Sequence, residues 1–255
     1  MSIPRHIHQI WLGPRPVPGR WVAGWRRAHP GWAHTLWRES DVLPILPAGT
    51  VRVWDHYVSR QRWHGAADVA RVAILLRHGG VYADVDSEVV TPFDEAPFMA
   101  ASFFAGRALP TVTHAYRLAN GVIGAEVDHP ILVTYAEMIA QAERLEPVWD
   151  TVGGTMLTLA VAAHPGLAGV MILPTRVFYP EGMKGERAPG DETVYTRHYW
   201  ASTYGLYGYQ DESSAQLFAR RVPARKTVRQ RLPRVVRRFG RAVLRRIDAA
   251  RGRSA

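Results

Sequence analysis

Residues 66–94, which read AADVARVAILLRHGGVYADVDSEVVTPFD, decide the fold of this chain. The first half of the stretch is apolar nearly all round, and that pattern predicts a buried helix. Asp68 and Arg71 interrupt the apolar run and lie on one face of the helix, because they are three residues apart. Buried charges are costly unless they are paired or used. We therefore expect these two side chains to form an ion pair or part of a site.

The second half of the stretch predicts a short strand that ends in two carboxylates. Gly79 and Gly80 end the helix, since glycine adopts the left-handed cap without strain. Residues 81–83 then form the strand, and Asp84 and Asp86 follow it. Residues two apart in a strand point the same way, so both carboxylates should face one side. Such oxygen ligands suit Mg²⁺ or Mn²⁺, which can also hold a diphosphate.

Each part of this pattern also has a plain structural explanation. A single Asp-x-Asp is commonly a solvated loop, and a buried Asp–Arg pair can serve stability alone. The combination is more specific: A-D-x-x-R, a short spacer, then G-G-x-Y-x-D-x-D, from Ala67 to Asp86. It resembles the sugar-binding region of DXD-containing glycosyltransferases (family 32), which include fungal α-mannosyltransferases and bacterial capsule and glycolipid enzymes. More remotely, it resembles the glucosylating domains of large bacterial toxins.

The resemblance implies an enzyme. It implies transfer of a hexose, with retention, from a nucleotide-diphosphate sugar to a glycan or glycolipid acceptor, with Mn²⁺ (or Mg²⁺) as cofactor. It also implies a GT-A-like fold, an α/β fold in which helices flank a single Rossmann-like mixed sheet. The candidate catalytic residues are Asp68, Arg71, Asp84 and Asp86. Asp84 and Asp86 are also the first two candidate metal ligands.

The opening segment extends the resemblance. IPRHIHQIWL, residues 3–12, predicts a first strand, and the family commonly opens with I-P-x-x-I-H-Q-I-W. By that likeness the end of the strand touches the nucleotide, with Trp11 stacked on the base and with Gln9 or the backbone hydrogen-bonded to it. The alternative is that Trp11 packs in the core or in the loop. Tyr82, the aromatic residue of the central motif, is assigned to donor binding in the same way.

Two later segments offer further contacts to the sugar. Residues 118–124, LANGVIG, resemble the strand that lines the sugar site, so Asn120 would bind a sugar or acceptor hydroxyl. The alternative is a plain Asn-Gly turn. In TVGGT, residues 151–155, Gly154 stands where the family commonly has proline. Glycine at a helix start allows a ligand to approach closely, but a plain junction between loop and helix explains it equally.

The segment YTRHYWASTY, residues 195–204, supplies a candidate third metal ligand. The family has H-H-W-x-G-S-W near the end of its catalytic core. This chain keeps His198 and Trp200, but has Tyr199 in place of the second histidine. By the resemblance His198 completes the metal shell, and an imidazole nitrogen suits Mn²⁺ better than Mg²⁺. A single histidine can also be structural.

Two alternatives to a glycosyltransferase remain open at this stage. Phosphatases of the haloacid-dehalogenase type also use Asp-x-Asp after a strand, but they want Thr or Val two residues later, where this chain has Glu88. A non-catalytic, arginine-tailed protein that binds membranes or nucleic acid would keep its function without Asp84 and Asp86. Loss of activity in those variants would separate an enzyme from such a binding protein.

Composition bounds the class of protein. The 255 residues are 47% hydrophobic and include no cysteine, which predicts one globular domain without disulfides or thiolate metal sites. No segment has the length and apolar character of a signal peptide or a membrane span, so we expect a cytoplasmic protein. The other predicted strands cover residues 32–37, 98–104, 170–173 and 177–179, and the other predicted helices cover residues 21–29, 130–144 and 156–163.

The net charge of +10 is concentrated at the carboxyl end. Residues 220–253 carry a net +13, so the rest of the chain is mildly acidic. We expect a catalytic domain at 1–218 and a basic tail at 219–255, with one amphipathic helix over residues 226–250. Such a helix suits the anionic inner face of the cell membrane. The alternatives are a docked terminal helix or nucleic-acid binding. We do not expect nucleic acid, because no base-reading motif is visible elsewhere.

Overall fold

The computed structural model describes residues 2–110 and 116–220, and the predicted helix at 226–250 lies outside the described residues. A six-stranded mixed sheet has the strand order β2-β1-β3-β6-β5-β7. Its strands are β1 (His6–Ile10), β2 (Ala33–Trp37), β3 (Gly80–Ala83), β5 (Phe103–Arg107), β6 (Leu118–Ala125) and β7 (Val170–Leu173). Strands β2, β1 and β3 run parallel, as do β5 and β7, while β6 is antiparallel to both β3 and β5.

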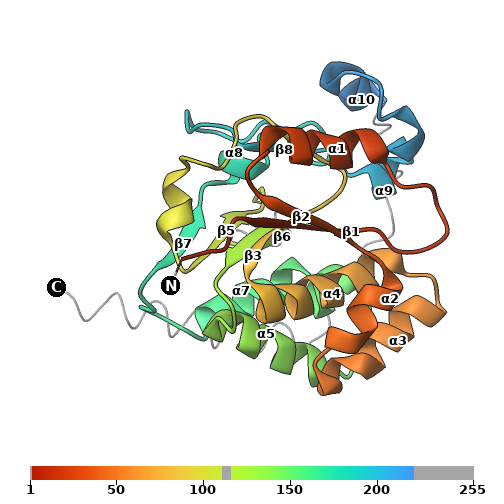
Figure 1. The fold of residues 1–255 in the computed structure, drawn as a ribbon, viewed down its shortest axis with the longest axis vertical. Helices are drawn as coiled ribbons and strands as arrows, with labels where there is room; N and C mark the ends of the chain where they lie inside the picture. Colours follow the sequence, from red (N-terminus) through yellow and green to blue (C-terminus); the bar gives the residue numbers. More distant parts are fainter. Residues whose placement is uncertain (1, 111–115, 221–255) are drawn as a thin grey trace. The chain divides into compact units, whose positions relative to one another are not determined.

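Helices cover both faces of this sheet, as Figure 1 shows. One face carries α1 (Gly19–Ala28), and the other carries α3 (Val51–Ser59), α4 (Trp63–His78), α5 (Pro130–Ala140) and α7 (Gly154–Ala162). The shorter helices are α2 (Glu39–Val42), α6 (Val148–Thr151), α8 (Thr175–Phe178), α9 (Ala201–Tyr204) and α10 (Ser214–Ala219), with 3₁₀ helices η1 (Leu43–Ile45), η2 (Ala48–Thr50), η3 (Pro97–Ala100) and η4 (Leu206–Tyr209). None of these described helices is long and apolar enough to cross a bilayer.

Alternation along the strands builds a separate core on each face of the sheet. In β3, Val81 packs with Trp25 of α1, whereas Tyr82 belongs to the larger core under α4, α5 and α7. The central helix α4 is buried over ten of its residues, as the sequence predicts. It ends at Gly79, whose φ of 60° is in the left-handed region that favours glycine. The predicted α/β fold is confirmed.

A small second sheet connects the end of β3 to the late part of the chain. Strand β4 (Ser87–Val89) pairs antiparallel with β8 (Thr196–His198), and Ser87 faces His198 in the register. Trp25 of α1 donates its indole N–H to the carbonyl of Ser87 at 3.0 Å. This pairing fixes where His198 stands relative to Asp84 and Asp86.

Three predictions of local structure were wrong. The predicted strand at 98–104 is divided between η3 and the start of β5, and the predicted strand at 177–179 lies largely in α8. Both segments are rich in buried aromatic residues, which suit either conformation. The helix predicted at 130–144 ends earlier, at Ala140 in α5.

Candidate functional site

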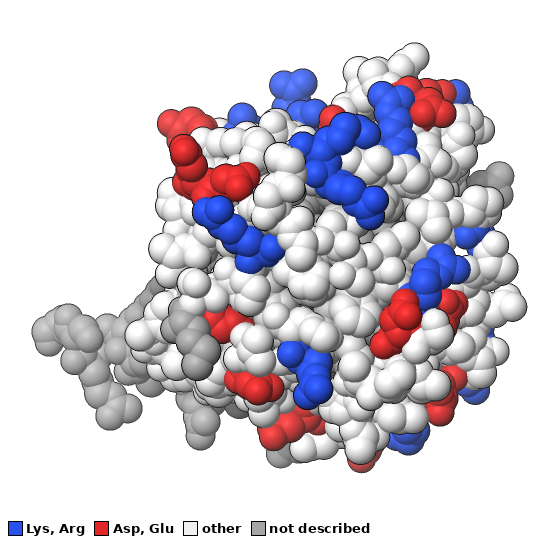
Figure 2. Space-filling view, in the orientation of Figure 1, with Lys and Arg blue, Asp and Glu red and all other residues white. Residues whose placement is uncertain are grey.

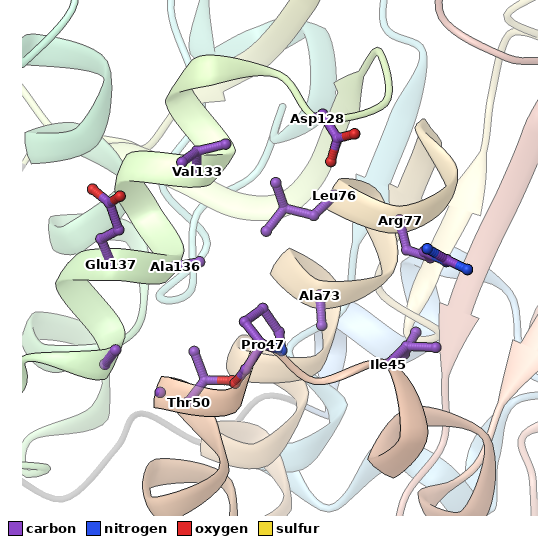
Figure 3. Close-up of a pocket in the computed structure, with 12 residues that line it drawn as sticks. Ile45, Pro47, Thr50, Ala73, Leu76, Arg77, Asp128, Val133, Ala136 and Glu137 are labelled. Atoms are coloured by element: carbon purple, nitrogen blue, oxygen red, sulfur yellow. The ribbon is translucent and has the colours of Figure 1, made fainter.

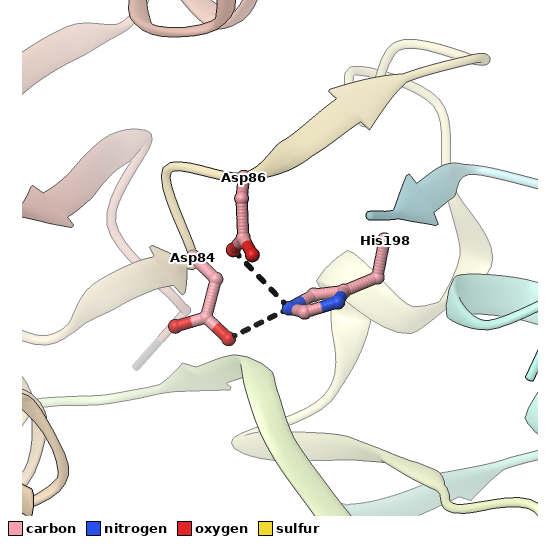
Figure 4. Close-up of side chains that lie close together, drawn as sticks. All are labelled: Asp84, Asp86 and His198. Atoms are coloured by element: carbon pink, nitrogen blue, oxygen red, sulfur yellow. Dashed lines mark hydrogen bonds and ion pairs between the residues drawn. The ribbon is translucent and has the colours of Figure 1, made fainter. Parts of the chain in front are cut away.

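Asp84 and Asp86 lie in the turn between β3 and β4, one on each side of Val85 (Figure 4). Strand β3 ends at Ala83, and the amide of Ser87 donates to the carbonyl of Asp84 at 3.2 Å to close the turn. The two carboxylates do converge, but the turn brings them together. The alternation of a strand, from which we predicted this, was therefore the wrong reason.

His198 lies close to these two carboxylates and forms a cluster with them. Its Nε2 lies 3.1 Å from Oδ2 of Asp84 and 3.3 Å from Oδ1 of Asp86. The amide N–H of Trp200 donates to Nδ1 of His198 at 3.1 Å. The neutral ring therefore carries its proton on Nε2 and donates it toward the carboxylates.

The three side chains fit a divalent cation. One ligand atom from each of Asp84, Asp86 and His198 lies within 4.8 Å of the others, and no other such cluster occurs in residues 2–110 and 116–220. Two carboxylate oxygens with one imidazole nitrogen suit Mn²⁺, and the Nε2 proton would leave when a metal binds there. The backbone amide of Ala201 donates to Oδ2 of Asp86 at 2.7 Å and leaves Oδ1 facing the cluster.

Arg71 links this cluster to Asp68. Its Nη2 lies 2.7 Å from Oδ1 of Asp68 and 3.4 Å from Oδ1 of Asp84, and its Nη1 donates to the carbonyl of Asn120. The guanidinium also lies over the Tyr82 ring, 4.4 Å from the centroid. Only 5% of the Arg71 side chain is exposed. The helix thus carries its two predicted charges into one buried network.

Asp68 uses only one of its two carboxylate oxygens in this network. Its Oδ1 accepts from Arg71 and from Nδ2 of Asn120 at 3.0 Å. Its Oδ2 has no hydrogen-bond partner within the described part of the chain. A Cβ placed on Gly153 would lie 3.1 Å from Oδ2, so this oxygen faces the junction between α6 and α7. It can accept a hydroxyl from a ligand there.

The three acids of the site have different proton affinities. Burial raises the pKa of Asp68 to about 7, in spite of its ion pair with Arg71. Burial also raises the pKa of Asp86, and the neighbouring Asp84 adds to this effect while His198 opposes it. Burial acts on Asp84 too, but Arg71, His198 and the Tyr82 hydroxyl outweigh it and lower the pKa of that carboxyl. Asp84 is therefore the acid of the three that holds its negative charge most firmly.

Tyr82 lies behind the cluster. Its hydroxyl donates to Oδ1 of Asp84 at 2.6 Å, and the residue is only 1% exposed. The predicted donor-binding residue therefore contacts Asp84, and it would act on a ligand through that carboxylate. Its ring also supports Arg71.

The two residues predicted to touch the base have different surroundings. Trp11 packs with Val85 of the Asp84–Asp86 turn, and the Tyr207 ring meets it edge-on at 4.8 Å between centroids. Gln9 is fully buried on β1, where its Oε1 lies 3.0 Å from Nε2 of His34. The Nε2 of Gln9 has no partner among the described residues. Trp11 is thus next to the carboxylate turn, whereas the Gln9 side chain bonds to His34 on β2.

Gly154 has a structural reason to be glycine. A Cβ at this position would lie 2.2 Å from the carbonyl oxygen of Leu118, because α7 starts directly against β6. Proline, which carries a Cβ, would require the same shift. The close approach predicted for a ligand is made here by the protein's own backbone.

The sequence reasoning missed Gly121 and Tyr179. A Cβ on Gly121 would lie 2.7 Å from Oδ2 of Asp84 and 3.1 Å from the Tyr179 hydroxyl, so glycine leaves room for the carboxylate. That hydroxyl accepts the amide N–H of Val122 at 2.9 Å. The signal for Gly121 was its place directly after Asn120 inside an apolar strand, where glycine often marks a close approach.

The site is separate from a hollow of about 420 Å³ in the helical layer (Figure 3). That hollow is lined mainly by apolar side chains of α4, α5 and the segment before α3, and contains none of the predicted site residues. The cluster of Asp84, Asp86 and His198 lies instead where β3, β4 and β8 meet.

Known proteins resemble the chain in the same region. Residues 20–102 match the family described as glycosyltransferase sugar-binding region containing DXD motif, a range that includes Asp68, Arg71, Asp84 and Asp86. Inositol phosphoceramide mannosyltransferase 1 of Schizosaccharomyces pombe is 32% identical over 137 residues, which cover 51% of this chain and 41% of that protein. An uncharacterised glycosyltransferase of Acanthamoeba polyphaga mimivirus is 30% identical over 138 residues, 51% of this chain and 52% of that protein.

The fold also has a solved counterpart. The PaToxG glycosyltransferase superposes with a TM-score of 0.55 at 17% identity, over 66% of this chain and 72% of that one. The chain spans about half or less of the length of the two curated relatives. The resemblance predicted from the sequence is confirmed: residues 20–102 match the sugar-binding region of the DXD-containing glycosyltransferases, and the fold is of the GT-A type.

Proposed function

We propose that this protein is a metal-dependent, retaining glycosyltransferase that moves a hexose from a nucleotide-diphosphate sugar to a glycan or glycolipid acceptor. One observation carries the proposal: Asp84, Asp86 and His198 offer three ligand atoms within 4.8 Å of one another. Beside them, Arg71 and Asp68 form a buried, charged and hydrogen-bonding wall. A nucleotide-diphosphate sugar needs both features side by side, the metal ligands for its diphosphate and the hydrogen-bonding wall for its sugar.

Asp84, Asp86 and His198 would hold Mn²⁺ or Mg²⁺. When bound, such a cation supplies positive charge that stabilises the leaving diphosphate. Asp84 is prepared for this role by Arg71 and Tyr82, which fix its Oδ1 and leave Oδ2 directed toward His198. The amide of Ala201 orients Asp86 in the same manner.

Asp68 and Arg71 would hold the sugar. The available Oδ2 of Asp68 accepts a sugar hydroxyl, while Arg71 keeps the carboxylate in place through Oδ1. Asn120 shares that oxygen, so its role is to orient Asp68. Trp11, next to Val85, would stack on the base. Gln9, fully buried on β1 and bonded to His34, would support the end of that strand and would not touch the base itself. Tyr207 would have to turn away from Trp11 to admit a base.

Retention rests on the family resemblance and on how the carboxylates are engaged. Asp84 is held by Arg71, Tyr82 and His198, and Asp86 by Ala201 and His198. Carboxylates held in this way are suited to binding rather than to attack on the anomeric carbon. We therefore propose that the acceptor hydroxyl attacks on the face that the diphosphate leaves, with a departing phosphate oxygen taking its proton.

Titration of metal and donor tests this proposal. Binding of Mn²⁺ is followed by electron paramagnetic resonance, and donor binding by thermal shift with UDP-, GDP- and dTDP-hexoses. Asp84→Asn and Asp86→Asn should each weaken Mn²⁺ binding by at least tenfold and abolish the donor-dependent shift. Asp55→Asn, at an exposed position of α3, is the matched control and should change neither. Wild-type turnover that persists in EDTA would refute the metal-dependent mechanism.

A mannosyl donor and a glycolipid acceptor are the first to try. The Schizosaccharomyces pombe relative is named as a mannosyltransferase of inositol phosphoceramide, which supports GDP-mannose within the panel and an anionic glycolipid as acceptor. Transfer of radiolabelled mannose from GDP-mannose to an inositol phosphoceramide would support this choice. Transfer only from a different nucleotide sugar would show that the donor is not GDP-mannose.

We further propose that the protein works at the anionic cytoplasmic face of a membrane. The net +13 of residues 220–253 supports this location. Lys and Arg side chains also gather in Figure 2 near the place of α1, where Arg20, Arg26 and Arg27 are exposed. The full chain should sediment with phosphatidylserine vesicles but not with phosphatidylcholine vesicles. Equal binding to both, or binding that survives replacement of the tail arginines by glutamine, would contradict the proposal.

A further inference from the structure

An exposed tryptophan stands next to the available oxygen of Asp68. Trp149, on the short helix α6, is 46% exposed, although tryptophan is usually well buried. A Cβ placed on Gly153 would lie 3.0 Å from Cα of Trp149 and 3.1 Å from Oδ2 of Asp68. The backbone that carries the indole therefore lies close to the Asp68 carboxylate.

The helix that carries Trp149 is firmly held. Val148 is buried beneath it at 3% exposure. The Tyr57 hydroxyl donates to the carbonyl of Leu145 at 2.6 Å, and the Tyr135 hydroxyl donates to the carbonyl of Val152 at 2.5 Å. These bonds fix the chain on both sides of α6. An exposed ring on such a rigid support loses little conformational freedom when a ligand binds.

Polar groups surround this ring. Arg117 lies over the indole, 5.7 Å from its centroid, and its Nη1 lies 4.0 Å from Oδ1 of Asp150. Asp150 also accepts from the Thr155 hydroxyl at 2.8 Å. An apolar ring bordered by a guanidinium and a carboxylate matches a pyranose, which has an apolar C–H face and hydroxyls around its edge.

We propose that Trp149 is the stacking platform for a sugar ring of the acceptor, bordered by Arg117 and Asp150. This inference rests on the proposed function, because it places the acceptor beside the donor sugar held by Asp68. The exposure of the ring favours the acceptor over the donor. The buried residues Asp68, Arg71 and Asn120 suit a small enclosed sugar, whereas an open platform admits a larger glycan or glycolipid head group.

Four proteins test the platform: wild type, Trp149→Ala, Trp149→Phe and Tyr209→Ala. Tyr209 is the matched control, since it is 41% exposed and carries Arg220 over its ring at 3.8 Å. Two quantities are measured with the donor that the thermal-shift panel selects. The first is nucleotide release from the donor alone, and the second is KM for the methyl glycosides of mannose, glucose and galactose. Saturation-transfer NMR of the same glycosides reports binding without any turnover.

Loss of the indole should raise the acceptor KM about tenfold and abolish saturation transfer, while nucleotide release from the donor alone stays within about twofold. Trp149→Phe should recover most of the binding, and Tyr209→Ala should match wild type. An unchanged KM, an equal loss in Tyr209→Ala, or parallel loss of donor hydrolysis would overturn the platform. If wild type uses no donor, the proposed function fails. In that case, saturation transfer that is lost in Trp149→Ala would still support a sugar site at Trp149. If wild type itself shows no saturation transfer, the platform is refuted.

Discussion

His8 should make the stability of this protein depend on pH. The imidazole is fully buried on β1, where Nε2 lies 2.9 Å from the carbonyl of Gly79 and Nδ1 accepts the Trp37 indole N–H at 3.1 Å. Both ring nitrogens are thus used by the neutral form, with the proton on Nε2. A second proton on Nδ1 would face the indole hydrogen.

Burial, together with the nearby His6 and His78, lowers the pKa of His8 from 6.5 to about 3. A folded-state pKa below the unfolded value means that the stability due to neutral His8 is present above pH 6.5 and is lost as the pH falls toward 3. Between pH 7.5 and pH 5.0 the free energy of unfolding should fall by about 2 kcal/mol from this residue alone.

Urea unfolding followed by tryptophan fluorescence measures this loss at a series of pH values. His8→Gln retains a donor that reaches Gly79 but does not titrate, so its unfolding free energy should fall by about 2 kcal/mol less than that of wild type over the same range. His34, whose pKa is lowered to about 4 by burial and by Arg26, remains in both proteins and cancels in the difference. Parallel pH profiles for the two proteins would refute the reasoning.

Two further substitutions address the site itself. Arg71→Met should lower the free energy of unfolding by about 3–5 kcal/mol, because Asp68 and Asp84 would remain buried without the positive charge of the guanidinium. Urea unfolding measures this change, and a loss below about 1 kcal/mol would contradict the prediction. Gly121→Ala should displace the Asp84 carboxylate, since the new Cβ would lie 2.7 Å from Oδ2, and should weaken Mn²⁺ binding about tenfold or more. Gly208→Ala, with open space around its Cβ, is the control, and equal Mn²⁺ affinities would show that Asp84 is not displaced.

The parts of the fold that were predictable from sequence depend on local patterns. The apolar run, the paired glycines and the carboxylates of residues 66–86 gave α4, β3 and the start of the site, because each element is specified by its own residues. The strand predicted at 177–179 was wrong because an apolar run that short carries no period, and contacts with the rest of the core decide its conformation.

The same distinction holds within the site. Asp68 and Arg71 are neighbours on one helix, so their pairing could be predicted. The contributions of Gly121, Tyr179 and the amide of Ala201 depend on how distant segments pack, and no local pattern indicates them. His198 was found only through the family resemblance, since spacing alone does not show that it meets residues far away in the sequence.

The pairing of β4 with β8 has a consequence for the order of events during synthesis. His198 meets Asp84 across 114 residues of chain, and the amide of Ala201 reaches Asp86 across 115. A ribosome-bound chain that ends before β8 therefore has the paired acids but neither their histidine nor their amide donor. Contacts so distant in sequence form late in folding. The three proposed metal ligands should thus come together only after nearly all of the described domain has emerged from the ribosome.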